Sequence, residues 1–211
     1  MTSFRVLFPA LAFALSFLLS GYLLVAWLRY RPQRPRFLLY WSLALSLIYL
    51  FQIPVIMTSL GRVITVTRFN LFFSLTFPIT FLALVFLYWG TLEVIGVRPR
   101  PRKVWVFFLW VFAAVLFFGY HFITRKGVIE TYALPLVGNI IFYLPLRTLI
   151  ILTLVRWLSQ TPRTLWGALG AAGIIGESAL GIIRNSLVVK NVLTYPPEFW
   201  YIALSSLEIF F

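Results

Sequence analysis

Six long stretches of mostly apolar residues follow one another along the chain, each 20 to 25 residues long. An α-helix needs about 20 apolar residues to cross the hydrocarbon core of a bilayer, so each stretch is long enough for a transmembrane helix. In order, the predicted spans are Val6–Leu28, Phe37–Leu60, Phe69–Leu92, Val104–Thr124, Thr131–Val155 and Thr164–Ile183. This pattern predicts a chain that folds in lipid.

A seventh apolar stretch, Phe199–Phe211, follows the pair Pro196–Pro197 and has only 13 residues. At 1.5 Å per residue it gives a helix of about 20 Å, which is shorter than a hydrocarbon core of about 30 Å. We expect either a helix that ends inside the membrane or a chain that is a fragment of a longer protein, and we favour the fragment. The predicted fold class is an all-α integral membrane protein, a bundle of seven transmembrane helices with six full spans and a short or truncated seventh. Residues 1–211 are expected to form a single multi-pass domain without a soluble domain.

Composition agrees with this class and excludes several chemistries. The chain is 62% hydrophobic and 11% charged, whereas soluble domains have about 25% charged residues. It has no cysteine and one histidine, His121, which excludes disulfides, thiol catalysis and metal sites with several cysteine or histidine ligands. Motifs of metalloproteases, serine hydrolases and nucleotide-binding loops are absent from the sequence. We therefore predict no enzyme, catalytic residue, cofactor or metal.

Basic residues gather in short connections between the spans and predict the orientation. The net charge is +13, but this charge is expected to face anionic lipid headgroups rather than nucleic acid. The first, third and fifth connections hold ten Lys and Arg, and the opposite side holds seven. The positive-inside rule then places the N-terminus outside the cell membrane and the C-terminal end toward the cytoplasm. The residues expected at the headgroups are Arg31, Arg34, Arg36, Arg98, Arg100, Arg102 and Lys103.

Five polar residues within the spans are candidates for a ligand or ion site, because ionisable groups in hydrocarbon cost several kcal/mol and tend to be functional. They are Gln52, Asn139, Arg147, Glu177 and Glu208. Helix rise places four of them in one layer, from the middle to the outer half of the membrane, with Arg147 on the cytoplasmic side of the midplane. Arg147 and Glu177 then differ in depth by about 10 Å, so their pairing would need helix tilt and the full reach of arginine. Two interpretations stay open, a polar cluster that fixes helix register and a site for a ligand, an ion or a proton.

The sixth span also carries a series of glycines, which predicts close packing against neighbouring helices. They are Gly167, Gly170, Gly173, Gly176 and Gly181.

Three functions fit these observations. The favoured hypothesis is a sensor or receptor-like input module, because seven spans, an outer-half polar layer and an inward-pointing last helix are typical of one. The first alternative is a small proton- or cation-coupled transporter or channel that uses Glu177 and Glu208. The second alternative is an accessory subunit of a larger membrane complex. The partners that stay open are a small ligand and a homodimer or a larger membrane complex.

Overall fold

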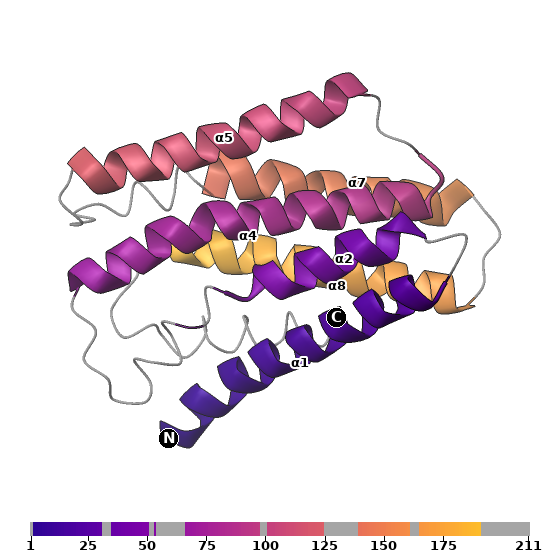
Figure 1. The fold of residues 1–211 in the computed structure, drawn as a ribbon, viewed down its shortest axis with the longest axis horizontal. Helices are drawn as coiled ribbons and strands as arrows, with labels where there is room; N and C mark the ends of the chain where they lie inside the picture. Colours follow the sequence, from indigo (N-terminus) through magenta and orange to yellow (C-terminus); the bar gives the residue numbers. More distant parts are fainter. Residues whose placement is uncertain are drawn as a thin grey trace.

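The computed structural model describes residues 2–30, 35–50, 53, 66–97, 101–124, 139–160 and 165–190. Within these ranges it contains six α-helices, one π-helical turn and no strand. The helices lie roughly side by side along one direction, and successive helices run in opposite directions (Figure 1). The all-helical class predicted from the sequence is therefore confirmed for the described part of the chain.

Helix α1 (Thr2–Arg29) packs along α2 (Arg36–Ile48), and two serines join them. The Ser20 hydroxyl donates to the carbonyl oxygen of Ser42 at 2.8 Å, and the Ser42 hydroxyl donates to the carbonyl oxygen of Ser20 at 2.9 Å. Both serines are buried. Small polar residues of this kind let helix backbones approach closely and bond across an apolar interface.

Helix α2 is shorter than the span predicted for residues 37–60, because it ends at Ile48 in a turn over Tyr49 and Leu50. A continuing α-helix would need the N–H of residue 54 to bond to the Leu50 carbonyl. Residue 54 is a proline, which has no N–H and clashes with that carbonyl in a helix. Proline at this position removes that bond and disfavours a continuous helix through residue 54.

Helix α4 (Val66–Val94) occupies the centre of the bundle and packs against α2, α5 and α7. Its segment from Phe81 to Leu87 supplies five of the buried apolar side chains of the described core, and Gly90 meets the indole ring of Trp41 so closely that a Cβ would overlap it. The helix ends at Val94, and Gly96 just beyond it has a φ of 77°, the left-handed conformation that glycine favours. Amide–carbonyl bonds from Gly96 to Glu93 and from Val97 to Leu92 form a Schellman motif that closes the helix.

Helix α5 (Pro101–Thr124) begins on a proline, which suits the first helical turn because the N–H it lacks would be unbonded there. The helix packs on α4 and exposes a broad apolar face on its other side. Five large side chains of that face, each more than half exposed, are Trp105, Val106, Phe108, Leu109 and Phe112.

The last described part of the chain is the π-helical turn η1 (Asn139–Tyr143), the helix α7 (Leu144–Gln160) that continues it, and α8 (Leu165–Lys190). Helix α8 packs on α7, and α7 packs on α4. Tyr143 at the end of η1 shares a buried hydrogen bond with Thr80 of α4, which ties the π-helical turn to the central helix.

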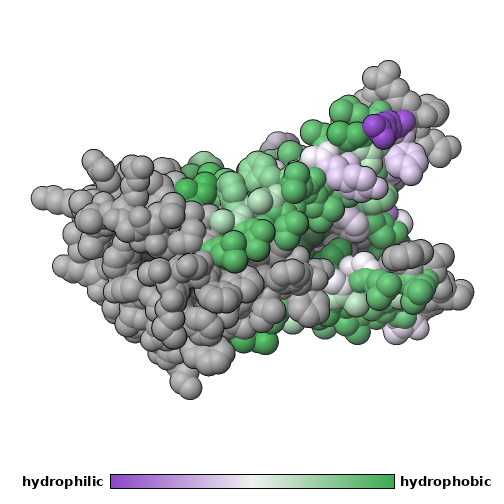
Figure 2. Space-filling view, turned by 90° about the horizontal axis from the view of Figure 1, so that it is seen from below, coloured by the Kyte–Doolittle hydropathy of each residue, from purple (hydrophilic) through white to green (hydrophobic). Residues whose placement is uncertain are grey.

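Two described helical segments, Ala10–Arg29 and Ile140–Ser159, are long and apolar enough to cross a membrane by length and composition. Apolar segments of 10 to 17 residues occur in α2, α4, α5 and α8. The hydrophobic surface extends over most of the described residues visible from below (Figure 2). The wider set of six full spans stays a prediction, and the seventh span at residues 199–211 lies outside the described residues.

Candidate functional site

Arg147 of α7 and Glu177 of α8 form a buried ion pair. The Arg147 Nη1 atom lies 2.9 Å from Glu177 Oε1 and also donates to the backbone carbonyl of Glu177 at 3.0 Å. The Arg147 side chain is 1% exposed and that of Glu177 is 11% exposed. The hydroxyl of Ser178, which is fully buried, donates to Glu177 Oε2 at 3.2 Å. Both oxygens of the carboxylate thus have a partner from the protein.

Gly181 makes the space through which arginine reaches the carboxylate. A Cβ at Gly181 would overlap the guanidinium group of Arg147, so the guanidinium lies directly against the backbone of α8 one turn beyond Glu177. Gly181, one of the glycines noted in the sequence of this span, thus lets α7 and α8 come close enough for the Arg147 side chain to reach Glu177.

The structure brings Arg147 and Glu177 into direct contact, the pairing for which the sequence estimate required helix tilt and the full reach of arginine. Both residues also lie closer to the middle of their helices than the predicted span ends imply. Helix α8 has 26 residues and extends to Lys190, beyond the predicted end of the span, so that Glu177 is its thirteenth residue and lies at its middle. Arg147 is likewise near the middle of the continuous segment formed by η1 and α7, residues 139–160.

The side chains of the other three predicted site residues lie outside the part of the chain that the structure describes. Gln52 and Glu208 lie outside the described residues. Asn139 is the first residue of η1, two helical turns before Arg147, and its side chain is outside the described set. Among the described residues, no group of three His, Cys, Asp or Glu side chains comes together in a way that could hold a metal ion.

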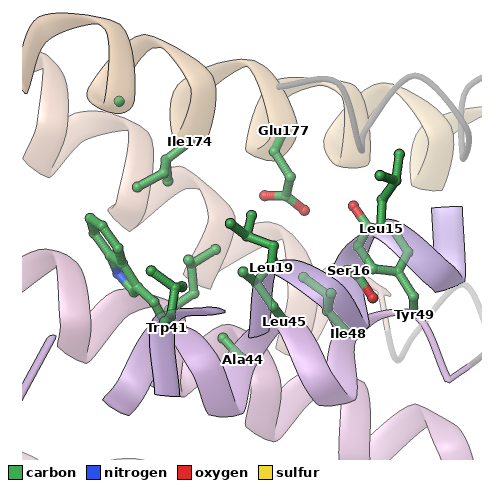
Figure 3. Close-up of a pocket in the computed structure, with 13 residues that line it drawn as sticks. Leu15, Ser16, Leu19, Trp41, Ala44, Leu45, Ile48, Tyr49, Ile174 and Glu177 are labelled. Carbon is green, nitrogen blue, oxygen red and sulfur yellow. The ribbon is translucent and has the colours of Figure 1, made fainter. Parts of the chain in front are cut away.

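A cavity of about 480 Å³ adjoins the ion pair and is lined by residues of α1, α2, α4 and α8 together with Tyr49. Its size is within the range of about 300 to 1,000 Å³ that is usual for small-molecule sites. The carboxylate of Glu177 points into this cavity, with Trp41 on one side and Ser16 and Tyr49 on the other (Figure 3). Most of the remaining wall is aliphatic. The lining residues are Leu15, Ser16, Leu19, Leu23, Trp41, Ala44, Leu45, Ile48, Tyr49, Leu87, Gly170, Ile174 and Glu177.

The wall that α1 contributes is partly exposed at the molecular surface. Leu15 and Leu19 are 44% and 48% exposed, whereas Ala44 and Ile48 of α2 on the inner wall are buried. Helix α1 packs on α2 and α8 packs on α7, and the cavity lies between these two helix pairs.

Sequence inspection did not single out the neutral members of this site, because it selected ionisable and amide side chains in the spans. Ser16 and Tyr49 have hydroxyls, and Trp41 has an aromatic face, but each of these residue types is common in apolar helices. One signal was present for α1. Ala12, Ser16 and Ser20 recur every four residues and are buried on a helix whose other side chains are mostly exposed. Small residues at this spacing are typical of the packing face of a membrane helix.

Comparison of the chain with protein-family models, with curated proteins and with solved structures gave no match.

Proposed function

We propose that the chain is a multi-pass membrane protein that works as a receptor-like sensor module and binds a small ligand in the cavity beside Glu177. The observation that carries this proposal is the Arg147–Glu177 pair at the wall of an apolar cavity. Buried ion pairs contribute little net stability, because desolvation offsets the attraction between the charges. An ion pair at the edge of a cavity of this size is more simply explained by a role in binding a ligand.

The arrangement of the helix ends supports the proposed membrane orientation. The ends of α1, α4 and α7 and the beginnings of α2, α5 and α8 lie at the same end of the bundle (Figure 1). The connections at this end carry the ten Lys and Arg that the sequence assigns to the cytoplasmic side. We propose that these residues contact anionic headgroups and that the cell membrane surrounds the apolar surface of the helices.

Native mass spectrometry of protein extracted from its own membranes tests ligand binding. We expect the wild-type protein to retain a small-molecule adduct. Leu19→Trp, which fills the cavity from α1, should lose that adduct. Leu18→Trp is the matched control, because Leu18 is 70% exposed on the same helix and does not line the cavity. Equal adduct in all three proteins, or none in any, would contradict the proposal.

A proton- or cation-coupled transporter is a second candidate, and one observation favours it. The carboxylate of Glu177 lines the cavity and is paired with the guanidinium of Arg147. A proton or cation that enters the cavity would compete with Arg147 for this carboxylate. Ion and solute flux into liposomes separates the two candidates. Flux by the parent protein that Glu177→Gln abolishes would favour the transporter, and the absence of flux in both proteins favours the sensor.

A further inference from the structure

We infer that the ligand of this cavity is a neutral amphiphile, an aliphatic molecule that ends in a hydroxyl group and donates a hydrogen bond to Glu177. This inference rests on the proposed function, since it gives the chemical class of the ligand that the cavity binds. Three features of the site lead to it, namely the charge balance, the direction of the available hydrogen bond, and the shape of the apolar wall.

The site is already electrically balanced before a ligand enters. The guanidinium of Arg147 compensates the carboxylate of Glu177 at 2.9 Å, and Glu177 is the only acidic or basic residue among the described residues that line the cavity. An ammonium ligand would leave a net positive charge in an apolar environment, and a carboxylate ligand would leave a net negative one. Either excess charge is costly in hydrocarbon, so a neutral ligand is favoured.

The carboxylate of Glu177 favours a ligand whose polar group donates a hydrogen bond. A carboxylate accepts about four hydrogen bonds and donates none. One acceptor position on Oε1 is taken by Arg147 and one on Oε2 by Ser178, so further acceptor capacity is left on the side that faces the cavity. A hydroxyl group can use this capacity, whereas an ether of the same length offers no donor.

The apolar wall sets the character of the ligand. The volume of about 480 Å³ lies in the range that is usual for sites of small organic molecules. Leucine, isoleucine and alanine make up most of the wall, and the Trp41 ring lies to one side of Glu177 (Figure 3). A single aliphatic chain such as that of tetradecan-1-ol suits this wall. The exposed wall at Leu15 and Leu19 suits entry of such a molecule from the lipid.

Photo-crosslinking in nanodiscs tests the inference. A tetradecan-1-ol analogue with a diazirine on its chain is the probe, and the labelled fraction is measured by intact-protein mass spectrometry. Unlabelled tetradecan-1-ol, 1-methoxytetradecane, tetradecylamine and tetradecanoic acid are the competitors. We expect the alcohol to compete at a concentration at least tenfold lower than each of the other three. We also expect Leu19→Trp to reduce labelling at least fivefold and Leu18→Trp to leave it unchanged.

The outcomes separate this inference from the proposed function on which it rests. If labelling is sensitive to Leu19→Trp but the amine, the acid or the ether competes as well as the alcohol, the cavity binds ligands and the neutral-alcohol inference is wrong. If labelling is the same in Leu19→Trp and in the parent, the cavity is not a binding site and both proposals fail. Leu15→Trp, at a second position of the α1 wall, repeats the test should Leu19→Trp not yield folded protein.

A charge variant tests the balance argument directly. Glu177→Gln removes the carboxylate and leaves Arg147 uncompensated beside the cavity. We expect tetradecanoic acid to become the strongest of the four competitors in this variant, with a preference over the alcohol of at least tenfold. An unchanged order of competitors in Glu177→Gln would overturn the assignment of the site as charge-balanced.

Discussion

Arg147 reaches Glu177 only because the residue next to it on α8 is a glycine. The guanidinium lies where the Cβ of any other residue at position 181 would be. The side chain of Arg147 is only 1% exposed. The sequence identified Arg147 and Glu177 as unusual, because charged residues within apolar spans stand out. It did not identify their contact, because a contact depends on where the helices end and on which glycine faces the arginine.

Gly181→Ala is predicted to destabilise the protein by about 1 to 3 kcal/mol, the usual cost of an atom forced into a packed interior. The physical reason is displacement of the guanidinium from Glu177. Thermal unfolding in detergent, followed by tryptophan fluorescence, measures the effect. Gly170→Ala on the same helix is the control, because nothing lies within 4 Å of a Cβ there, and its stability should be unchanged or higher by up to about 1 kcal/mol. Equal loss in both variants would refute the special role of Gly181.

Helix α1 is held to α2 by a narrow line of small residues, while most of its surface is exposed. Ala12, Ser16 and Ser20 form this line, and the paired bonds between Ser20 and Ser42 fix the register of the two helices. The existence and the type of α1 could be predicted from the sequence, since its apolar stretch is long and uninterrupted. The length of α2 could not, because the same apolar composition continues past the turn at Tyr49 and only Pro54 opposes a longer helix.

Ser42→Ala is predicted to lower the stability of the α1–α2 contact by about 1 kcal/mol, because one buried hydrogen bond is lost and the Ser20 carbonyl loses its donor. The double variant Ser20→Ala/Ser42→Ala should cost less than twice this amount if the two serines act as one unit. Ser46→Ala is the control, since the Ser46 hydroxyl bonds only to the carbonyl of Leu43 on its own helix. Unfolding midpoints of the four proteins measure these differences. A loss in Ser46→Ala as large as that in Ser42→Ala would show that the inter-helix bonds are unimportant.

The described helices alternate in direction, so that the ends of α1, α4 and α7 and the beginnings of α2, α5 and α8 lie at one end of the bundle. Counting Lys and Arg in the sequence predicts that this end faces the cytoplasm, because the number of spans between two connections decides whether they share a side. What the sequence could not supply is the cavity. Its wall combines residues from four helices, and most of these residues are leucines, isoleucines and an alanine that are common in apolar helices.

Two single cysteines test the proposed orientation, and the chain has no cysteine of its own to interfere. Ser159→Cys is near the end of α7 at the arginine-rich end of the bundle, and Lys126→Cys is in the predicted connection on the opposite side. A membrane-impermeant maleimide added to intact cells should label position 126 only, and position 159 should react after permeabilisation. Labelling of both positions in intact cells would contradict the multi-pass arrangement, and the reverse pattern would invert it.

The central claim is that the Arg147–Glu177 pair serves recognition rather than stability, and the double variant Arg147→Met/Glu177→Leu tests it most directly. Each single variant leaves a buried charge without its partner, which costs about 3 to 5 kcal/mol, whereas apolar replacement of both partners is often neutral or stabilising. The decisive measurement is the labelled fraction of the double variant with the tetradecan-1-ol probe, taken beside its unfolding midpoint. We predict a midpoint close to that of the parent and at least a tenfold loss of labelling. A stable double variant that labels as well as the parent would contradict the account.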